Sequence, residues 1–160
     1  MSTASSPASS PAPDASAELT ELTELTVLVY SDDVTTRQAV LMALGRRVAS
    51  DLPRLRYVEA ATEHAVLKHA HANDVDLVIL DGESTPVGGI GLCRTLKDEV
   101  PNSAPVLVIV GRPQDDWLAA WSRADGVASH PIDPVAMAAA TERVLRRFVP
   151  VVGSDVATSA

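Results

Sequence analysis

The chain has 160 residues and a formal net charge of −8 at pH 7, and 46% of its residues are hydrophobic but only 3% are aromatic. That length favours one domain with a substantial core. The sequence has neither the ~20-residue apolar run of a membrane span nor a secretion signal, and it lacks the basic stripe that nucleic-acid binding requires. We therefore expect a cytoplasmic protein with no membrane insertion and no nucleic-acid partner. The lone cysteine, Cys93, excludes an internal disulfide and is expected in the core.

Both ends of the chain differ in composition from its middle. Residues 1–24 are rich in Ser, Ala and Pro and contain acids but no Lys or Arg, which predicts a disordered acidic tail. The Glu-Leu-Thr repeat over residues 18–26 is interpreted as a linker rather than a short helical turn. We expect one folded domain over residues 25–150 and a second disordered tail over residues 151–160.

Between the tails, five strand candidates alternate with helical segments. The strands are predicted over residues 26–30, 55–59, 76–80, 106–110 and, more weakly, 126–129. The helices are predicted over about 34–48, 62–72, 90–99, 115–123 and 134–148. Three of the strands are continuous apolar runs, which is typical of parallel strands covered on both faces. The alternation predicts an α/β fold with a doubly wound, five-stranded parallel sheet, (βα)5.

Acidic residues follow the first and third predicted strands. Asp32 and Asp33 come after the first strand, and Asp81 and Glu83 come at the end of the third. Either Asp32 or Asp33 can cap the next helix, and Asp81 can be a turn residue. Two acidic clusters at equivalent strand ends instead favour a shared acidic pocket near the switch point of the sheet, of the kind that holds Mg²⁺.

Residues 25–147 resemble the receiver domains of bacterial two-component response regulators. The matching segments are VLVYSDDVTTR at the first strand, DLVILDGE at the third, the following Gly89, and SHPIDP after the fifth. The resemblance implies a flavodoxin-like fold with strand order 2-1-3-4-5. It implies that Asp81 is the phosphoacceptor for a histidine kinase. It also implies that Mg²⁺ binds weakly to Asp32, Asp81 and the backbone carbonyl of Glu83.

Several positions depart from the pattern of that family. Its acid pair falls on Ser31 and Asp32, or one residue later if the register shifts. Val110 stands in place of a Thr or Ser, Val127 in place of the switch aromatic, and His130 in place of a Lys. Valine cannot donate a hydrogen bond, and a neutral histidine lacks the permanent charge of lysine. We therefore expect slow phosphorylation and loss of the usual structural readout.

Two tryptophans share one face of the fourth predicted helix. Trp117 and Trp121 are four residues apart, so they lie either in the core or together on an exposed surface. Tryptophan is enriched where binding energy concentrates at interfaces. In receivers this helix, strand 5 and the last helix form the usual partner face, and Arg143, Arg146 and Arg147 would supply charge at its rim.

Three classes of function remain open from the sequence. The first is a stand-alone receiver protein without an output domain, which acts in signal transduction by binding a protein partner, either a histidine kinase or a larger complex. The second is a phosphorylation-independent adaptor or accessory subunit docked on a larger complex. The third is a metal-dependent enzyme, which is disfavoured because no second nucleophile or base is evident. His64, His69 and His71 are expected to be surface residues.

Overall fold

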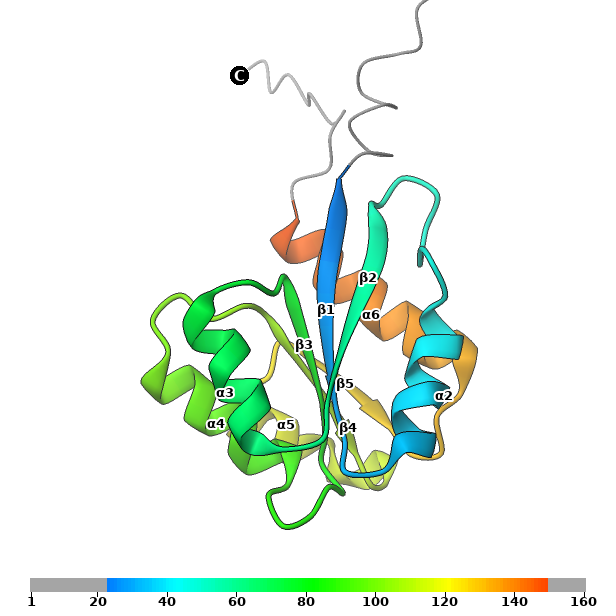
Figure 1. The fold of residues 1–160 in the computed structure, drawn as a ribbon. Helices are drawn as coiled ribbons and strands as arrows, with labels where there is room; N and C mark the ends of the chain where they lie inside the picture. Colours follow the sequence, from blue (N-terminus) through cyan, green and yellow to red (C-terminus); the bar gives the residue numbers. More distant parts are fainter. Residues whose placement is uncertain (1–22, 150–160) are drawn as a thin grey trace, which may run out of the picture.

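The computed structural model describes residues 23–149, which form a five-stranded sheet flanked by helices (Figure 1). The strands are β1 (Glu24–Tyr30), β2 (Arg54–Ala60), β3 (Leu77–Asp81), β4 (Val106–Val110) and β5 (Gly126–Ser129). The helices are α2 (Val34–Leu44), α3 (Glu63–Ala72), α4 (Gly89–Glu99), α5 (Asp116–Trp121) and α6 (Pro134–Phe148), with a 3-10 turn η1 (Pro113–Asp115) before α5. The predicted disordered tails, residues 1–24 and 151–160, lie outside the described residues except for residues 23 and 24.

The strand order confirms the predicted topology. The sheet runs β2-β1-β3-β4-β5, and every neighbouring pair is parallel. β3 and β4 are buried along their whole length, as their continuous apolar sequences predict. β2 and β5 are the edge strands.

Two hydrophobic cores fill the space on either side of the sheet. Helices α2 and α6 cover one face, and α3, α4 and α5 cover the other (Figure 1). Alternate residues of the central strands serve alternate cores: Val27 and Val29 pack beneath α2 and α6, whereas Leu28 and Tyr30 pack on the opposite face. Within residues 23–149, no helix has the length and apolar character that a membrane crossing requires.

The carboxyl ends of β1 and β3 lie side by side. Tyr30 pairs with Leu80 in the parallel register, so the residues that follow both strands emerge at one edge of the sheet. Helices leave β1 and β3 toward opposite faces, which makes this edge the switch point of the fold. The local structure therefore brings Ser31 and Asp81 together.

The predicted start of the first strand and the predicted end of the first helix were wrong by a few residues. β1 begins at Glu24, inside the segment interpreted as a linker, because Glu24 pairs with Arg54 and Leu25 is buried. α2 ends at Leu44 rather than near residue 48. Gly45 follows with φ +60°, a conformation that glycine adopts without steric cost and that stops the helix.

The glycines after β3 form the start of a helix. Gly88 is the N-cap, and Gly89 and Gly91 lie in the first turn of α4. A Cβ at Gly89 would lie 2.7 Å from the backbone carbonyl carbon and oxygen of Asp81. Only glycine therefore allows α4 to begin against the end of β3, directly beside Asp81.

Candidate functional site

The Asp81 carboxylate is buried and held by three donors. Only 3% of Asp81 is exposed. Its Oδ2 accepts a hydrogen bond from Ser31 Oγ at 2.8 Å, and its Oδ1 lies 2.8 Å from His130 Nε2 and accepts from the amide of Glu83 at 3.0 Å. Three of the roughly four acceptor positions of the carboxylate are thus used within the protein.

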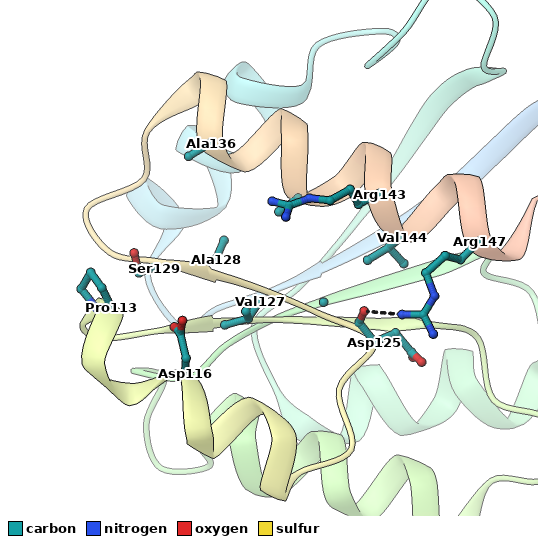
Figure 2. A pocket seen from close by; sticks show the side chains of 12 residues that line it. Pro113, Asp116, Asp125, Val127, Ala128, Ser129, Ala136, Arg143, Val144 and Arg147 are labelled. Carbon is teal, nitrogen blue, oxygen red and sulfur yellow. Dashed lines mark hydrogen bonds between the residues drawn. The ribbon is translucent and has the colours of Figure 1, made fainter.

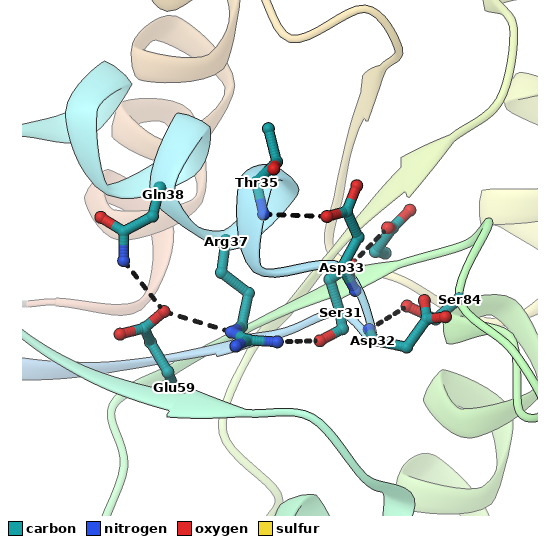
Figure 3. Close-up of polar contacts among 9 residues, drawn as sticks. Ser31, Asp32, Asp33, Thr35, Arg37, Gln38, Glu59 and Ser84 are labelled. Atoms are coloured by element: carbon teal, nitrogen blue, oxygen red, sulfur yellow. Dashed lines mark hydrogen bonds and ion pairs between the residues drawn. The ribbon is translucent and has the colours of Figure 1, made fainter.

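Ser31 connects the ends of β1 and β3. It is fully buried, and its hydroxyl also accepts a hydrogen bond from the amide of Asp33 at 3.1 Å. Arg37 donates to the Ser31 carbonyl at 2.7 Å and pairs with Glu59 at 3.1 Å (Figure 3). This network fixes the backbone after β1, so the serine presents its hydroxyl proton to Asp81.

The side chains of Asp32 and Asp33 make different hydrogen bonds. Asp33 is the N-cap of α2, because its Oδ1 accepts from the amide of Thr35 at 2.9 Å (Figure 3). Asp32 is exposed, and its Oδ2 accepts from the Thr85 hydroxyl at 3.1 Å. This side-chain hydrogen bond is the main reason that the pKa of the Asp32 carboxyl lies below its usual value. Asp32 is therefore the carboxylate that faces solvent beside Asp81.

Val110, Val127 and His130 lie on β4, on β5 and directly after β5. Val110 ends β4 and is 1% exposed, and Val127 of β5 packs partly buried against the same core. His130 follows β5, and its side chain is 24% exposed while its Nε2 contacts Asp81. The imidazole thus contacts the Asp81 carboxylate, whereas the side chain of Val110 has no hydroxyl with which to do so.

Magnesium would find few donors at this site. In the part of the chain that the structure describes, no three His, Cys, Asp or Glu side chains gather into a metal-binding group. Asp32 offers an exposed carboxylate, whereas Asp81 is already hydrogen-bonded, and Ser31 brings a neutral hydroxyl. The side chain of Glu83 lies over Gly111. Because Mg²⁺ binds through one or two carboxylates and several waters, Asp32 and Asp81 are the side chains of this site that fit it.

The two tryptophans are exposed, so the alternative that they fill the core is wrong. Trp117 is 64% exposed and Trp121 is 51% exposed, while Ala119 between them faces the sheet and is buried. The Arg94 guanidinium lies 4.4 Å from the centroid of the Trp121 ring, a cation–π contact between α4 and α5. Large exposed rings on one helix face form a surface suited to a protein partner.

The three arginines of α6 do not form one group. Arg146 pairs with Asp51, in the turn before β2, at 2.8 Å and with Glu142 at 2.7 Å. Arg143 and Arg147 lie on the side of α6 that faces β5 (Figure 2). Neither of them forms a salt bridge with a carboxylate among residues 23–149.

Sequence reasoning missed three polar residues that shape the site. Ser31 had been considered only as a replaced acid, but it holds Asp81. Ser84 is buried and accepts from the amide of Asp32 at 3.2 Å, and Thr85 holds the Asp32 carboxylate. The one available signal was the run of hydroxyl residues after Glu83, directly behind the acidic strand end.

The fold and site together define a receiver-type α/β protein. The receiver domain of a Francisella response regulator superposes with a TM-score of 0.63 at 18% identity, over 77% of this chain and 98% of that one. A two-component response regulator from Clostridium difficile superposes equally well, with a TM-score of 0.63 at 18% identity, over 79% of this chain and 99% of that one. At these identities the likeness concerns the fold alone.

Sequence relatives extend the likeness to the family. An uncharacterised response regulatory protein of Mycobacterium tuberculosis, found in two strains, is 49% identical over 124 residues, which are 78% of this chain and 93% of that protein. The transcriptional regulatory protein CseB of Streptomyces avermitilis is 31% identical over 127 residues, covering 76% of this chain and 49% of CseB. No family model matches the sequence. The chain belongs to the response-regulator receiver family, as its resemblance predicted.

Proposed function

We propose that this chain acts in two-component signal transduction as an atypical receiver that works by binding another protein. Asp81 holds the phosphoacceptor position, and its phosphorylation is impaired. The proposal assigns the chain no catalytic activity, places it in the cytoplasm, and names a histidine kinase or a larger complex as its partner.

The observation that carries the proposal is the engagement of both Asp81 oxygens. Phosphorylation requires one carboxylate oxygen to attack phosphorus, while the bond from phosphorus to the leaving atom of the donor breaks and that atom takes the electron pair. The leaving atom is an imidazole nitrogen when a phosphorylated histidine kinase is the donor and an acyl oxygen when the donor is acetyl phosphate. Here Oδ2 holds the Ser31 hydroxyl and Oδ1 lies beside His130. Attack by either oxygen withdraws electron density from at least one of these contacts, which raises the barrier by part of a charge-assisted hydrogen bond, about 1.5–3 kcal/mol.

The missing readout supports the same proposal. A receiver signals phosphorylation by moving a Thr or Ser and an aromatic side chain, and this chain has Val110 and Val127 in those places. Mg²⁺ at Asp32 and Asp81 would help to neutralise a phosphoryl group, but the donor set favours weak binding. A phosphoryl group on Asp81 would therefore have little means of reshaping β4 and β5.

A second candidate is a phosphorylation-independent adaptor or accessory subunit on a larger complex. The exposed Trp117 and Trp121 favour it, because two large rings one helical turn apart can bury much apolar area against a partner. Both candidate functions use the protein-binding face that carries Trp117 and Trp121. They differ only in whether Asp81 needs to react.

Incubation of the full chain with acetyl phosphate and Mg²⁺, read by intact mass, tests the proposal. We expect slow or incomplete addition of one phosphoryl group to the wild type and none to Asp81→Asn. The double substitution Val110→Thr with His130→Lys should increase the rate by at least about tenfold, because it returns two donors to the phosphoryl oxygens. If the double variant and the wild type react equally fast and completely, phosphorylation is not impaired and the proposal fails.

A further inference from the structure

A groove of about 510 Å³ runs along the β5 edge of the sheet, between α5 and α6 (Figure 2). Its floor includes the strand residues Gly126, Val127, Ala128 and Ser129, and its α6 wall includes Ala136, Ala140 and Val144. This volume lies within the ~300–1,000 Å³ range of ligand-binding pockets. The groove opens on the opposite side of β5 from β4, where the sheet formed by residues 23–149 has no further strand.

The outer side of β5 offers backbone hydrogen-bonding groups. The amide of His130 donates to the Val110 carbonyl at 2.9 Å, and backbone groups along a strand point alternately to its two sides. Gly126, Ala128 and His130 therefore turn their N–H and C=O groups toward β4, whereas Val127 and Ser129 turn theirs toward the groove. Such a row of outward groups is a template for an added strand.

The α6 wall of the groove adds positive charge. Arg143 and Arg147 are both exposed, and their bonds among residues 23–149 go to backbone oxygens: Ala139 for Arg143 and Asp125 for Arg147. The α5 wall instead carries the exposed carboxylate of Asp116 (Figure 2). An extended peptide in the groove would therefore meet opposite charges on its two faces.

The spacing of these charges fits an extended chain. Arg143 and Arg147 are four residues apart on a helix, which is about 6 Å along its axis. Side chains on one face of a strand recur every second residue, about 6.6–6.8 Å apart. Acidic residues at alternate positions of a peptide can thus reach both arginines at once. This sequence's own Glu-Leu-Thr repeat places its acids three apart, which does not match.

From these features we infer that β5 binds an extended acidic peptide segment of a protein partner as a sixth strand, with acidic side chains at alternate positions facing Arg143 and Arg147. The backbone of Val127 and Ser129 supplies the main-chain hydrogen bonds, and the α6 arginines set the preferred sequence. The inference rests on the proposed protein-binding function and specifies how the partner is held.

A fluorescent peptide of alternating Val and Glu, titrated into the full 160-residue chain and read by anisotropy, tests this inference. We expect saturable binding that weakens with salt and a much weaker signal for a Val/Lys peptide. Arg143→Ser with Arg147→Ser should weaken binding by about tenfold, because two partly exposed ion pairs are lost. Arg146→Ser is the matched control and should change affinity less than about twofold, since Arg146 is held by Asp51 and Glu142.

Two N-methylated peptides separate strand addition from general attraction to positive charge. One is methylated at every Val amide and the other at every Glu amide, and only one of these sets can face β5. We expect the affinity of one peptide to fall by at least about tenfold while the other is retained, since lost main-chain bonds cannot be replaced. Equal affinities for the two peptides, or no binding of the unmethylated peptide, would overturn the inference.

Trp117→Ala separates this inference from the proposed function. Trp117 does not line the groove, so peptide affinity should stay within about twofold in this variant. Loss of peptide binding in Trp117→Ala would contradict the groove as the peptide site. If Trp117→Ala still binds both the protein partner and the peptide, the result contradicts the tryptophan surface as the partner site and leaves the peptide groove standing.

Discussion

At the scale of single residues, Asp81 has both carboxylate oxygens hydrogen-bonded within the protein. The carboxylate is buried beside Ser31 and His130, and within residues 23–149 no buried side-chain nitrogen or oxygen lacks a hydrogen-bond partner. A buried charge is tolerated only when it is paired or hydrogen-bonded. The same contacts that stabilise the folded state therefore oppose the reaction of Asp81.

Removal of the Ser31 hydroxyl should show how much the stability of the folded state depends on its hydrogen bond to Asp81. Ser31→Ala leaves Asp81 Oδ2 buried with one donor fewer, and we expect the free energy of unfolding to fall by about 1–3 kcal/mol in urea denaturation. In an Asp81→Leu background the same substitution should cost clearly less, because the acceptor is gone. Equal losses in both backgrounds would show that the Ser31–Asp81 bond contributes nothing.

The Asp32 carboxyl gives a prediction about how the stability of the protein depends on pH. Its pKa is lowered from 3.8 in the folded protein, mainly by the Thr85 hydroxyl, so its contribution to stability is present above pH 3.8 and is lost as the pH falls through the folded-state pKa. Thr85→Val should raise the pKa of Asp32 in an NMR titration. The variant should be less stable than wild type at neutral pH, with the difference vanishing in acid. A difference that grows in acid would contradict this assignment.

The residue types at the site were predictable, but their contacts were not. Asp81 and Asp32 stand out because each follows an apolar run that reads as a strand. The bond between Ser31 and Asp81 depends on the β1–β3 register and on rotamers, which sequence patterns do not specify. The Thr85 contact depends on the path of the loop after β3, and no periodicity predicts that path.

At the scale of secondary-structure elements, the N-terminus of α4 has the least room for change. Gly89→Ala would place a Cβ 2.7 Å from the Asp81 backbone, so we expect about 1–3 kcal/mol of destabilisation in thermal or urea unfolding. Gly91→Ala is the matched control, since nothing lies within 4 Å of a Cβ there. It should stabilise α4 by about 0.5–1 kcal/mol. Similar effects of the two substitutions would rule out a close approach at Gly89.

The positions of the elements followed from sequence more closely than their ends. Continuous apolar runs predicted three of the five strands. The predicted start of the last helix at residue 134 was confirmed, and Asp133 caps it by accepting a hydrogen bond from the Ala136 amide. The start of β1 was missed because Glu24 and Leu25 continue a polar repeat, and only pairing with β2 makes them a strand. The end of α2 was missed because Gly45 was not recognised as its stop signal.

At the scale of the whole molecule, the carboxyl ends of the central strands and the β5 edge of the sheet have separate properties. The carboxyl ends of β1 and β3 carry the hydrogen-bonded Asp81 carboxylate. Helix α5 carries two exposed tryptophans, α6 carries exposed arginines, and β5 is an edge strand of the sheet that residues 23–149 form. The βα rhythm predicted the sheet and its order. It could not predict that the groove between α5 and α6 stays open, because that depends on how the two helices pack around an edge strand.

The central claim is that this chain works through protein contact at the α5 surface rather than through phosphate on Asp81. The most direct test compares how much of the same partner co-purifies from the source cell with wild type, Trp117→Ala and Asp81→Ala. Truncation of a buried interface tryptophan typically costs ~2–4 kcal/mol, so Trp117→Ala should lose roughly thirty- to a thousand-fold in affinity while its melting temperature stays near wild type. Asp81→Ala should retain the partner. Loss of the partner in Asp81→Ala, with Trp117→Ala still bound, would contradict the claim.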